Sequence, residues 1–337
     1  MIGTTRRVAH VLIALALGAG ALIALGAAPA SAADPVGYVI AQGERECWLA
    51  SVDLVTGTTQ QVGSPSPDKC AFNLEFTPDG TRLLGTHVAD GVALLVEFDL
   101  TTGDVTTLGQ LGDFNVGGPG DEQGNLTLPP AGGLYTYLVP DVEPPAPLAV
   151  DPACDGRALC LFSGETADPG TLTYVNSAPQ QFTEYFGLAT SCAGVTSSIR
   201  NAELQEAATT SWGAPSASAP PPQTLTQVNL TSTGPATTDV GTSVGDGVFL
   251  SSLDYDSTGA LFAVGFEPEN VGPSLFTLDP STGVATQVTT LNDGSEPINV
   301  GVLGFAIAHP CTPTTPVIPL QPPAAQPLAV VTPRFTG

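Results

Sequence analysis

The stretch LVEFDLTTGDVTTLG, from Leu95 to Gly109, joins an apolar-alternating segment to a Thr-rich one through a turn. Successive side chains of a strand point to opposite faces, so LVEFDL predicts a strand with two distinct faces. Asp99 opens the turn, where its carboxylate can accept backbone N–H groups, and Gly103 closes it in a left-handed conformation that costs glycine little. The stretch therefore predicts a β-hairpin whose Thr-rich second strand suits the outer edge of a sheet.

The same hairpin pattern recurs along the chain. Its other copies are LASVDLVTGTTQQVG (49–63), LTQVNLTSTGPATTDVG (225–241) and LFTLDPSTGVATQV (275–288). One hairpin repeated at intervals of tens of residues is typical of a repeat protein built from sheets.

A second hairpin type, with a Pro/Asp/Gly turn, alternates with the first at 73–86, 125–138 and 251–265. Joining the two types gives a four-stranded meander, seen most clearly at 72–109 and 249–290. Four-stranded antiparallel sheets repeated radially are the blades of a β-propeller, so an all-β propeller is the predicted fold class. A two-layer sandwich is the alternative, but a sandwich does not require one hairpin to recur at near-constant spacing.

The chain ends predict how the ring closes. After the N-terminal segment, 36–41, 47–54 and 58–63 supply three strands without an innermost partner, whereas 300–311 is a lone apolar strand. We expect this last strand to complete the first blade, with Phe305 alongside the strands near Tyr38 and Trp48. Such pairing of the N- and C-terminal strands leaves no open sheet edge.

The number of blades follows from the spacing of the inner-type strands, which are separated by 52, 127 and 50 residues near Leu74, Leu126, Leu253 and Leu303. The long gap holds either one further blade with long insertions or two compact blades. We predict five blades, with six as the alternative. Within the gap, 197–208 is expected to form a short helix capped by Ser198, and 214–222 a proline-rich loop.

The repeated pattern of apolar strand, Asp-x-x-Thr-Gly turn and Thr-rich strand resembles the repeats of secreted bacterial propellers of the YVTN-type and quinoprotein-like groups. The resemblance covers Val52 to Gly63, Phe98 to Gly109, Val228 to Gly241 and Leu278 to Val288. It implies the propeller fold, while the activities in these groups, many of unknown function, differ too much to transfer.

The N-terminus predicts export. Arg6 and Arg7 precede an apolar run from Val8 to Ala28, and Ala30-Ser31-Ala32 offers a small-residue cleavage site. We expect residues 1–32 to be a signal peptide, 33–311 the propeller domain and 312–337 a disordered, proline-rich tail. An uncleaved anchor is the alternative. The mature protein is predicted to be secreted, extracellular or in the cell envelope, without a membrane span.

Charge narrows the range of partners. The chain has a net charge of −24, and because residues 1–32 hold two Arg and no acids, the remainder has 6 Lys+Arg against 32 Asp+Glu, or −26. Nucleic acid and anionic membranes are therefore disfavoured. Solubility is the ordinary explanation of this charge, and cation binding is the functional one.

Six cysteines lie after the signal segment, and an even number in an exported chain favours disulfides. Fifteen pairings are possible. Proximity suggests Cys47–Cys70 and Cys154–Cys160, which leaves Cys192–Cys311; pairing of Cys311 with Cys47 or Cys70 would instead lock the seam of the ring. In the loop-entropy model the Cys192–Cys311 bridge contributes roughly 4.9 kcal/mol, against roughly 2.4 for Cys154–Cys160.

Candidate chemical groups are few. His87 and His309 have no partner specified by spacing, so structural roles at loops or strand edges are expected rather than catalysis. The carboxylate pairs Asp254/Asp256 and Asp121/Glu122 could bind calcium if loops brought them together, but DYDSTG is already explained as a hairpin turn. No catalytic residue or cofactor is predicted, although calcium remains possible as a ligand.

The first functional hypothesis is a monomeric, non-enzymatic binding module for an unknown extracellular ligand or protein. The alternative is a carboxylate-based or calcium-assisted hydrolase or lyase at the mouth of the central channel, and a redox quinoprotein ranks third. Three or more converging Asp, Glu, Asn or His side chains would favour an enzyme, whereas apolar or small residues would favour binding.

Overall fold

A computed structural model describes residues 36–89, 92–115, 125–138, 159–178, 185–201, 222–231, 237–267 and 272–311. The predicted signal peptide, the proline-rich tail, the loop 214–222, the Asp121/Glu122 pair and the Cys154–Cys160 bridge lie outside what these residues describe.

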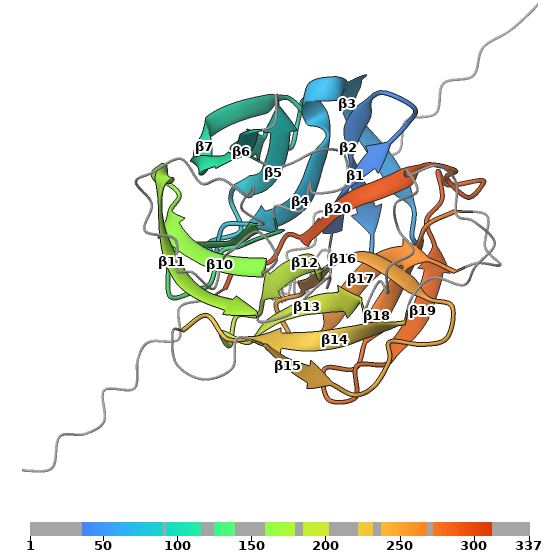
Figure 1. Cartoon of the computed structure of the whole chain (residues 1–337). Coiled ribbons are helices and arrows are strands. Elements are labelled where there is room, and N and C mark those ends of the chain that lie inside the picture. The colour runs from blue at the N-terminus through green and yellow to red at the C-terminus, as the bar shows by residue number, and fades with distance from the viewer. Residues whose placement is uncertain are drawn as a thin grey trace, which may run out of the picture. The chain divides into compact units, whose positions relative to one another are not determined.

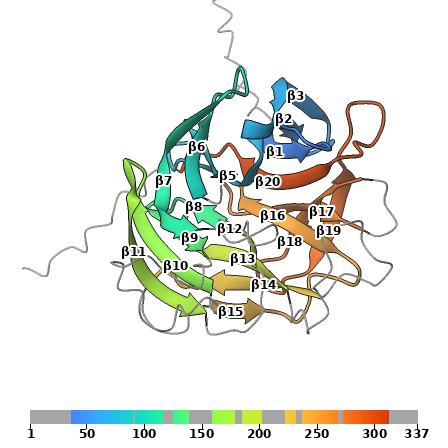
Figure 2. The same ribbon diagram turned by 45° about the horizontal axis from the view of Figure 1, so that its top comes forward.

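Within these ranges, twenty strands form five four-stranded antiparallel sheets, which are the blades of a five-bladed β-propeller (Figures 1 and 2). From the innermost strand outward, blade I contains β20 (Gly301–Ile307), β1 (Val36–Gln42), β2 (Cys47–Asp53) and β3 (Thr59–Ser66). Blade II contains β4 (Ala71–Phe76), β5 (Leu83–Ala89), β6 (Val92–Phe98) and β7 (Val105–Asn115).

The other three blades follow in chain order. Blade III contains β8 (Asn125–Thr127), β9 (Leu134–Leu138), β10 (Leu159–Glu165) and β11 (Asp168–Ala178). Blade IV contains β12 (Tyr185–Thr190), β13 (Thr196–Asn201), β14 (Gln223–Val228) and β15 (Thr237–Val240). Blade V contains β16 (Phe249–Tyr255), β17 (Leu261–Phe266), β18 (Ser274–Leu278) and β19 (Ala285–Thr290).

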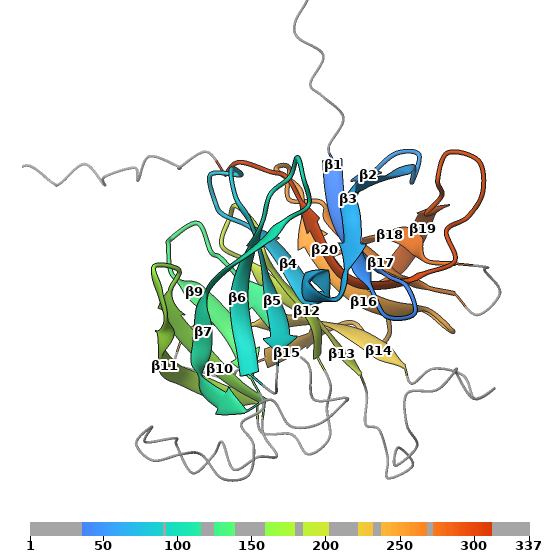
Figure 3. The same ribbon diagram turned by 90° about the horizontal axis from the view of Figure 1, so that it is seen from above.

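The predictions of five blades and of their closure are confirmed. The long gap between inner strands contains a single further inner strand, β12. In blade I, β20 pairs antiparallel with β1, with Phe305 opposite Val39 and Ala306 opposite Tyr38. Figure 3 shows β20, from the red end of the colour bar, among the blue strands of blade I. The N-terminal strands thus hold the last strand in the sheet.

The helix expected at 197–208 is wrong over 197–201, and 202–208 lie outside the described residues. Thr196–Asn201 is strand β13, paired with β12 on one side and β14 on the other. Ser198 does not cap a helix; its hydroxyl is buried and donates to the Gly187 carbonyl at 2.6 Å. Pairing on both edges overrides the local helical signal, because two ladders satisfy the backbone of this segment.

Both faces of a blade are buried, which explains the apolar pattern of the repeats. In β6, Leu95 packs with Leu126 and Phe162 of blade III, whereas Val96 and Phe98 belong to a cluster shared with blade I. The alternation therefore separates contacts with one neighbouring blade from contacts with the other. Each blade is held by burial of apolar side chains on its two sides.

The glycines of the repeated hairpin also bring neighbouring blades together at the outer edge. Gly103, in the β6–β7 turn, has φ of +67°, and a Cβ added there would lie 2.2 Å from the Val62 carbonyl oxygen of β3. The same arrangement recurs in blade V, where a Cβ on Gly283 would lie 2.3 Å from the Val240 carbonyl oxygen of β15. The motif glycine is required by the turn and by the contact between blades.

We expect Gly103→Ala to destabilise the protein by about 3 kcal/mol or more, because it adds a backbone clash to the left-handed φ penalty. Gly259→Ala is the matched control: Gly259 has φ of +86° but nothing within 4 Å of an added Cβ, so about 1–2 kcal/mol is expected. Urea unfolding measures both losses. Equal losses of stability would show that the neighbouring blade moves to accommodate the added Cβ with no loss of stability.

Candidate functional site

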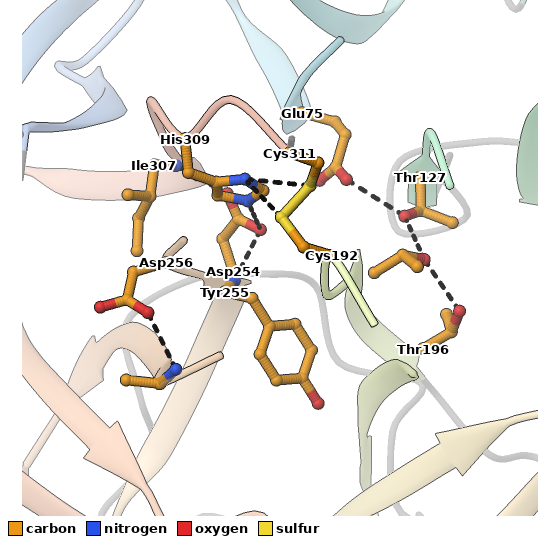
Figure 4. A network of polar contacts seen from close by, with 12 residues as sticks. Glu75, Thr127, Cys192, Thr196, Asp254, Tyr255, Asp256, Ile307, His309 and Cys311 are labelled. Atoms are coloured by element: carbon orange, nitrogen blue, oxygen red, sulfur yellow. Dashed lines mark hydrogen bonds and ion pairs between the residues drawn. A yellow bond between two sulfur atoms is a disulfide. The ribbon is translucent and has the colours of Figure 1, made fainter. Parts of the chain in front are cut away.

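The five inner strands place one residue each at an equivalent position around the centre of the propeller. These residues, here called the central ring, each follow a buried apolar residue: Glu75, Thr127, Thr190, Asp254 and Ile307. Contacts link neighbouring members. Thr127 Oγ1 lies 3.2 Å from Glu75 Oε1 and 2.8 Å from Thr190 Oγ1. Figure 4 shows this polar network, which brings together side chains from blades that are distant in sequence.

Asp254 fastens blade V to the closing strand of blade I. Its Oδ1 accepts the N–H of Tyr255 at 2.7 Å, and its Oδ2 accepts the N–H of Ile307 at 2.6 Å. Burial raises the pKa of Asp254, while His309 and these two N–H groups oppose the shift. The two carboxylate oxygens thus accept hydrogen bonds from the backbone of blade V and from the backbone of the closing strand β20.

Glu75 is the least satisfied polar side chain of the ring. The residue is 3% exposed, and among the described residues its Oε2 has no hydrogen-bond partner. Burial, followed by the negative charge of Asp254, raises the pKa of Glu75 well above its ordinary value, and the Thr127 hydroxyl opposes this only in part. Two carboxylates close together in a dry site favour a protonated Glu75.

His309 lies between Asp254 and a disulfide. Its Nε2 is 3.8 Å from Asp254 Oδ1, and its Nδ1 is 3.9 Å from Cys192 Sγ and 3.8 Å from Cys311 Sγ. Burial lowers the pKa of His309, but the nearby carboxylate of Asp254 outweighs burial, so the net shift is upward. Figure 4 shows the imidazole beside both groups.

The structure contains two of the expected disulfides. Cys47 is joined to Cys70, and Cys192 to Cys311 with a sequence separation of 119. Cys192 follows β12 of blade IV and Cys311 follows β20 of blade I, so this bridge passes blade V, which lies between them. It clasps the closing strand to the body, as the proximity-based pairing implied.

The other predicted residues occupy structural positions. His87 lies within β5, paired with Ala71 of β4 and Leu94 of β6 rather than at a strand edge, and its Nδ1 is 2.9 Å from the Cys70 carbonyl oxygen. Asp256 accepts the N–H groups of Thr258 and Ala260 in its own turn. Asp254 and Asp256 therefore accept hydrogen bonds from different backbone groups.

Sequence reasoning missed the central ring and the partners of His309. The available signal was the alignment of inner strands, in which Leu74-Glu75 matches Leu253-Asp254. Spacing along the chain did not pair His309 with Asp254, because the two are brought together only when the last strand closes the ring.

An open cleft of about 610 Å³ lies at the other end of β20. Its side chains come from the β1–β2 turn, the end of β17 and the segment before β20: Gln42, Glu44, Phe266, Asn299 and Val300, together with Gly43, Gly272 and Gly301. Since Gly301 begins β20 and His309 follows its end, the length of a seven-residue strand, about 23 Å, separates the cleft from the buried groups.

Comparison with known proteins yields similar folds at low identity. No protein-family model and no curated protein matches the chain. Among solved structures, TolB from Acinetobacter baumannii is 10% identical, with 76% of this chain and 53% of that chain covered and a TM-score of 0.43. A chain of the nidogen/laminin complex is 10% identical over 82% of this chain and 99% of its own length, with a TM-score of 0.45.

A gluconolactonase from Xanthomonas campestris is 12% identical over 75% of each chain, with a TM-score of 0.39. At these identities and TM-scores the three structures assign no activity or partner to this chain. The described part of the chain contains no helix with the length and hydrophobicity of a membrane span.

We expect Glu75→Gln to raise the melting temperature at neutral pH. Because the folded-state pKa of Glu75 is raised, its contribution to stability is complete below the unfolded value of 4.5 and is lost as pH rises through the folded pKa. The amide mimics the protonated acid. At pH 7 we expect the melting temperature to rise by about 2–4 °C for each 1 kcal/mol of added stability. This rise should become smaller below pH 4.5.

Glu97→Gln is the matched control, because the hydrogen bonds and charge of Arg82 lower the pKa of Glu97. This substitution should give no stabilisation at pH 7. A lower melting temperature for Glu75→Gln at neutral pH would show that the ring requires the negative charge.

Proposed function

We propose that this protein is a secreted, non-enzymatic β-propeller that binds an extracellular ligand in the open cleft. One observation carries the proposal: within the described residues, the side chains suited to acid–base chemistry converge where they are buried, whereas the open cleft presents groups suited to recognition. Glu75, Asp254 and His309 are 3%, 0% and 7% exposed.

Burial argues against catalysis by this trio. A general acid or base must come within hydrogen-bonding reach of its substrate. Both oxygens of Asp254 are already bonded to backbone N–H groups, and the Cys192–Cys311 bridge lies against His309. Glu75, Asp254 and His309 converge as the residues of an active site would, but we infer that they stabilise the contact between blade V and the closing strand.

The cleft has the composition of a binding site. Its volume falls within the range of small-ligand pockets, on the order of 300–1,000 Å³. Gln42 and Asn299 offer amide donors and acceptors, Phe266 an aromatic surface, and Glu44 an exposed carboxylate. With a net charge of −24 on the chain, this set favours a cationic ligand, such as a basic segment of an extracellular peptide or protein.

The test uses a fluorescent, lysine-containing hexapeptide and its glutamate-containing counterpart at physiological salt. We expect the cationic peptide to bind and the acidic one not to bind. Glu44→Lys should weaken binding roughly tenfold, since one charge in the cleft changes sign. Glu165→Lys, at an exposed position on β10 of blade III, makes the same change in net charge away from the cleft and should have less than about a twofold effect.

Anisotropy titration gives the dissociation constants. Equal weakening of binding by the two variants would show that the peptide is attracted only by the overall charge. Failure of the cationic peptide to bind would refute the proposed ligand class.

A calcium-assisted hydrolase or lyase is the second candidate, favoured by the convergence of Glu75, Asp254 and His309 and by the unpartnered Glu75 Oε2. A bound ion would stabilise the native state by mass action. The binding-module proposal predicts the same melting temperature in excess chelator and in millimolar calcium. If calcium raised the melting temperature of the wild-type protein but not that of Glu75→Gln, the enzyme would be favoured instead.

A further inference from the structure

The two described disulfides lie in contrasting surroundings. Cys47 is fully buried in an apolar cluster with Ile40 and Leu49, whereas its partner Cys70 is partly exposed and its carbonyl is contacted by His87. Cys192 and Cys311 are both partly exposed, and each sulfur lies within 4 Å of His309 Nδ1. Both cysteines of the second bridge are partly exposed, against one of the first, so a thiol can attack the second bridge at either sulfur.

The imidazole contacts both sulfurs at similar distance. Nδ1 lies 3.9 Å from Cys192 Sγ and 3.8 Å from Cys311 Sγ, so a proton on this atom could be shared with either sulfur. The opposite ring nitrogen lies 3.8 Å from Asp254 Oδ1. Asp254 is itself fixed by two backbone N–H groups, and it therefore holds the ring in an orientation that directs Nδ1 at the bridge (Figure 4).

This arrangement suits thiol–disulfide exchange. Reduction expels one sulfur as a thiolate, and exchange is faster when that leaving thiolate is better stabilised. An adjacent imidazolium stabilises a thiolate and lowers the pKa of the corresponding thiol. A carboxylate behind the imidazole favours the imidazolium form.

We propose that Cys192–Cys311 is a redox-active disulfide that exchanges with small dithiols, with His309 stabilising the departing thiolate and Asp254 acting as its positioning residue. Cys47–Cys70 is the structural bridge of the same molecule. Redox state then controls the clasp between the ends of β12 and β20.

The exchange proceeds in two balanced steps. A thiolate of the dithiol attacks one protein sulfur, the S–S bond breaks, and a mixed disulfide forms while the other protein sulfur leaves as a thiolate beside His309. The second thiol of the reductant then loses its proton, attacks its own bound sulfur and releases the cyclic disulfide. Two electrons pass to the protein, and the two protons of the dithiol end on the two cysteines.

The test measures both bridges in one sample. The native protein is treated with limiting dithiothreitol in the presence of a chelator, which keeps trace metal from the freed thiols. Alkylation at timed intervals and peptide mapping then report each cysteine. We expect Cys192 and Cys311 to be modified at least about tenfold faster than Cys47 and Cys70.

Substitution of His309 separates thiolate stabilisation from exposure. His309→Ala removes a large side chain from the bridge, so exposure alone predicts faster reduction, whereas loss of the imidazolium predicts roughly tenfold slower reduction. His87→Ala is the control and should leave the Cys192–Cys311 rate unchanged. Faster or unchanged reduction in folded His309→Ala would overturn the proposal.

The wild-type protein provides a second measurement that needs no variant. The charged groups facing His309 are Asp254 and Asp256, with Glu75 of β4 acting on Asp254. Per unit of reductant thiolate, reduction of Cys192–Cys311 should slow as pH rises and His309 loses its proton, while the Cys47–Cys70 rate stays flat. Parallel pH profiles for the two bridges would also refute the role of His309.

Discussion

Pairing of β20 with β1 is the constraint on which the propeller depends. Before this pairing, blade I lacks its innermost strand and β20 has no sheet to join. Once Phe305 lies opposite Val39, the first and last segments share one ladder and blade I has its four strands. A single long-range contact thus converts a row of similar meanders into a ring.

The seam created by this closure also explains why ionisable groups are buried. Inner strands of neighbouring blades do not share a ladder, so side chains complete the contacts between them: Asp254 binds the N–H of Ile307, Ser252 that of Phe305, and Asn73 donates to the Leu126 carbonyl. A carboxylate is an effective acceptor for two N–H groups, but in a dry site it favours protonation of its neighbour Glu75. Burial raises the pKa of Glu75, and the Asp254 carboxylate that adds to this rise is the same one that binds the closing strand.

The two ends of β20 consequently differ in character. Its beginning lies at an open cleft with amides, a carboxylate and an aromatic side chain, whereas its end lies under a disulfide with a buried imidazole. Binding requires the accessibility of the first environment, and stabilisation of a thiolate requires the adjacent imidazolium of the second. One strand therefore connects the proposed recognition surface to the disulfide proposed for exchange.

The sequence by itself determined the repeated hairpin and the closed propeller ring, because turn glycines, apolar alternation and a lone last strand are local patterns. It favoured five blades over six, and the structure decided the number. The sequence misassigned 197–201 as part of a helix, since the pairing of β13 on both edges is not visible in local propensity. Only the tertiary structure decided that His309 faces Asp254 and the Cys192–Cys311 bridge. These groups come from three blades, and their proximity depends on how the blades pack around the centre, which no spacing along the chain encodes.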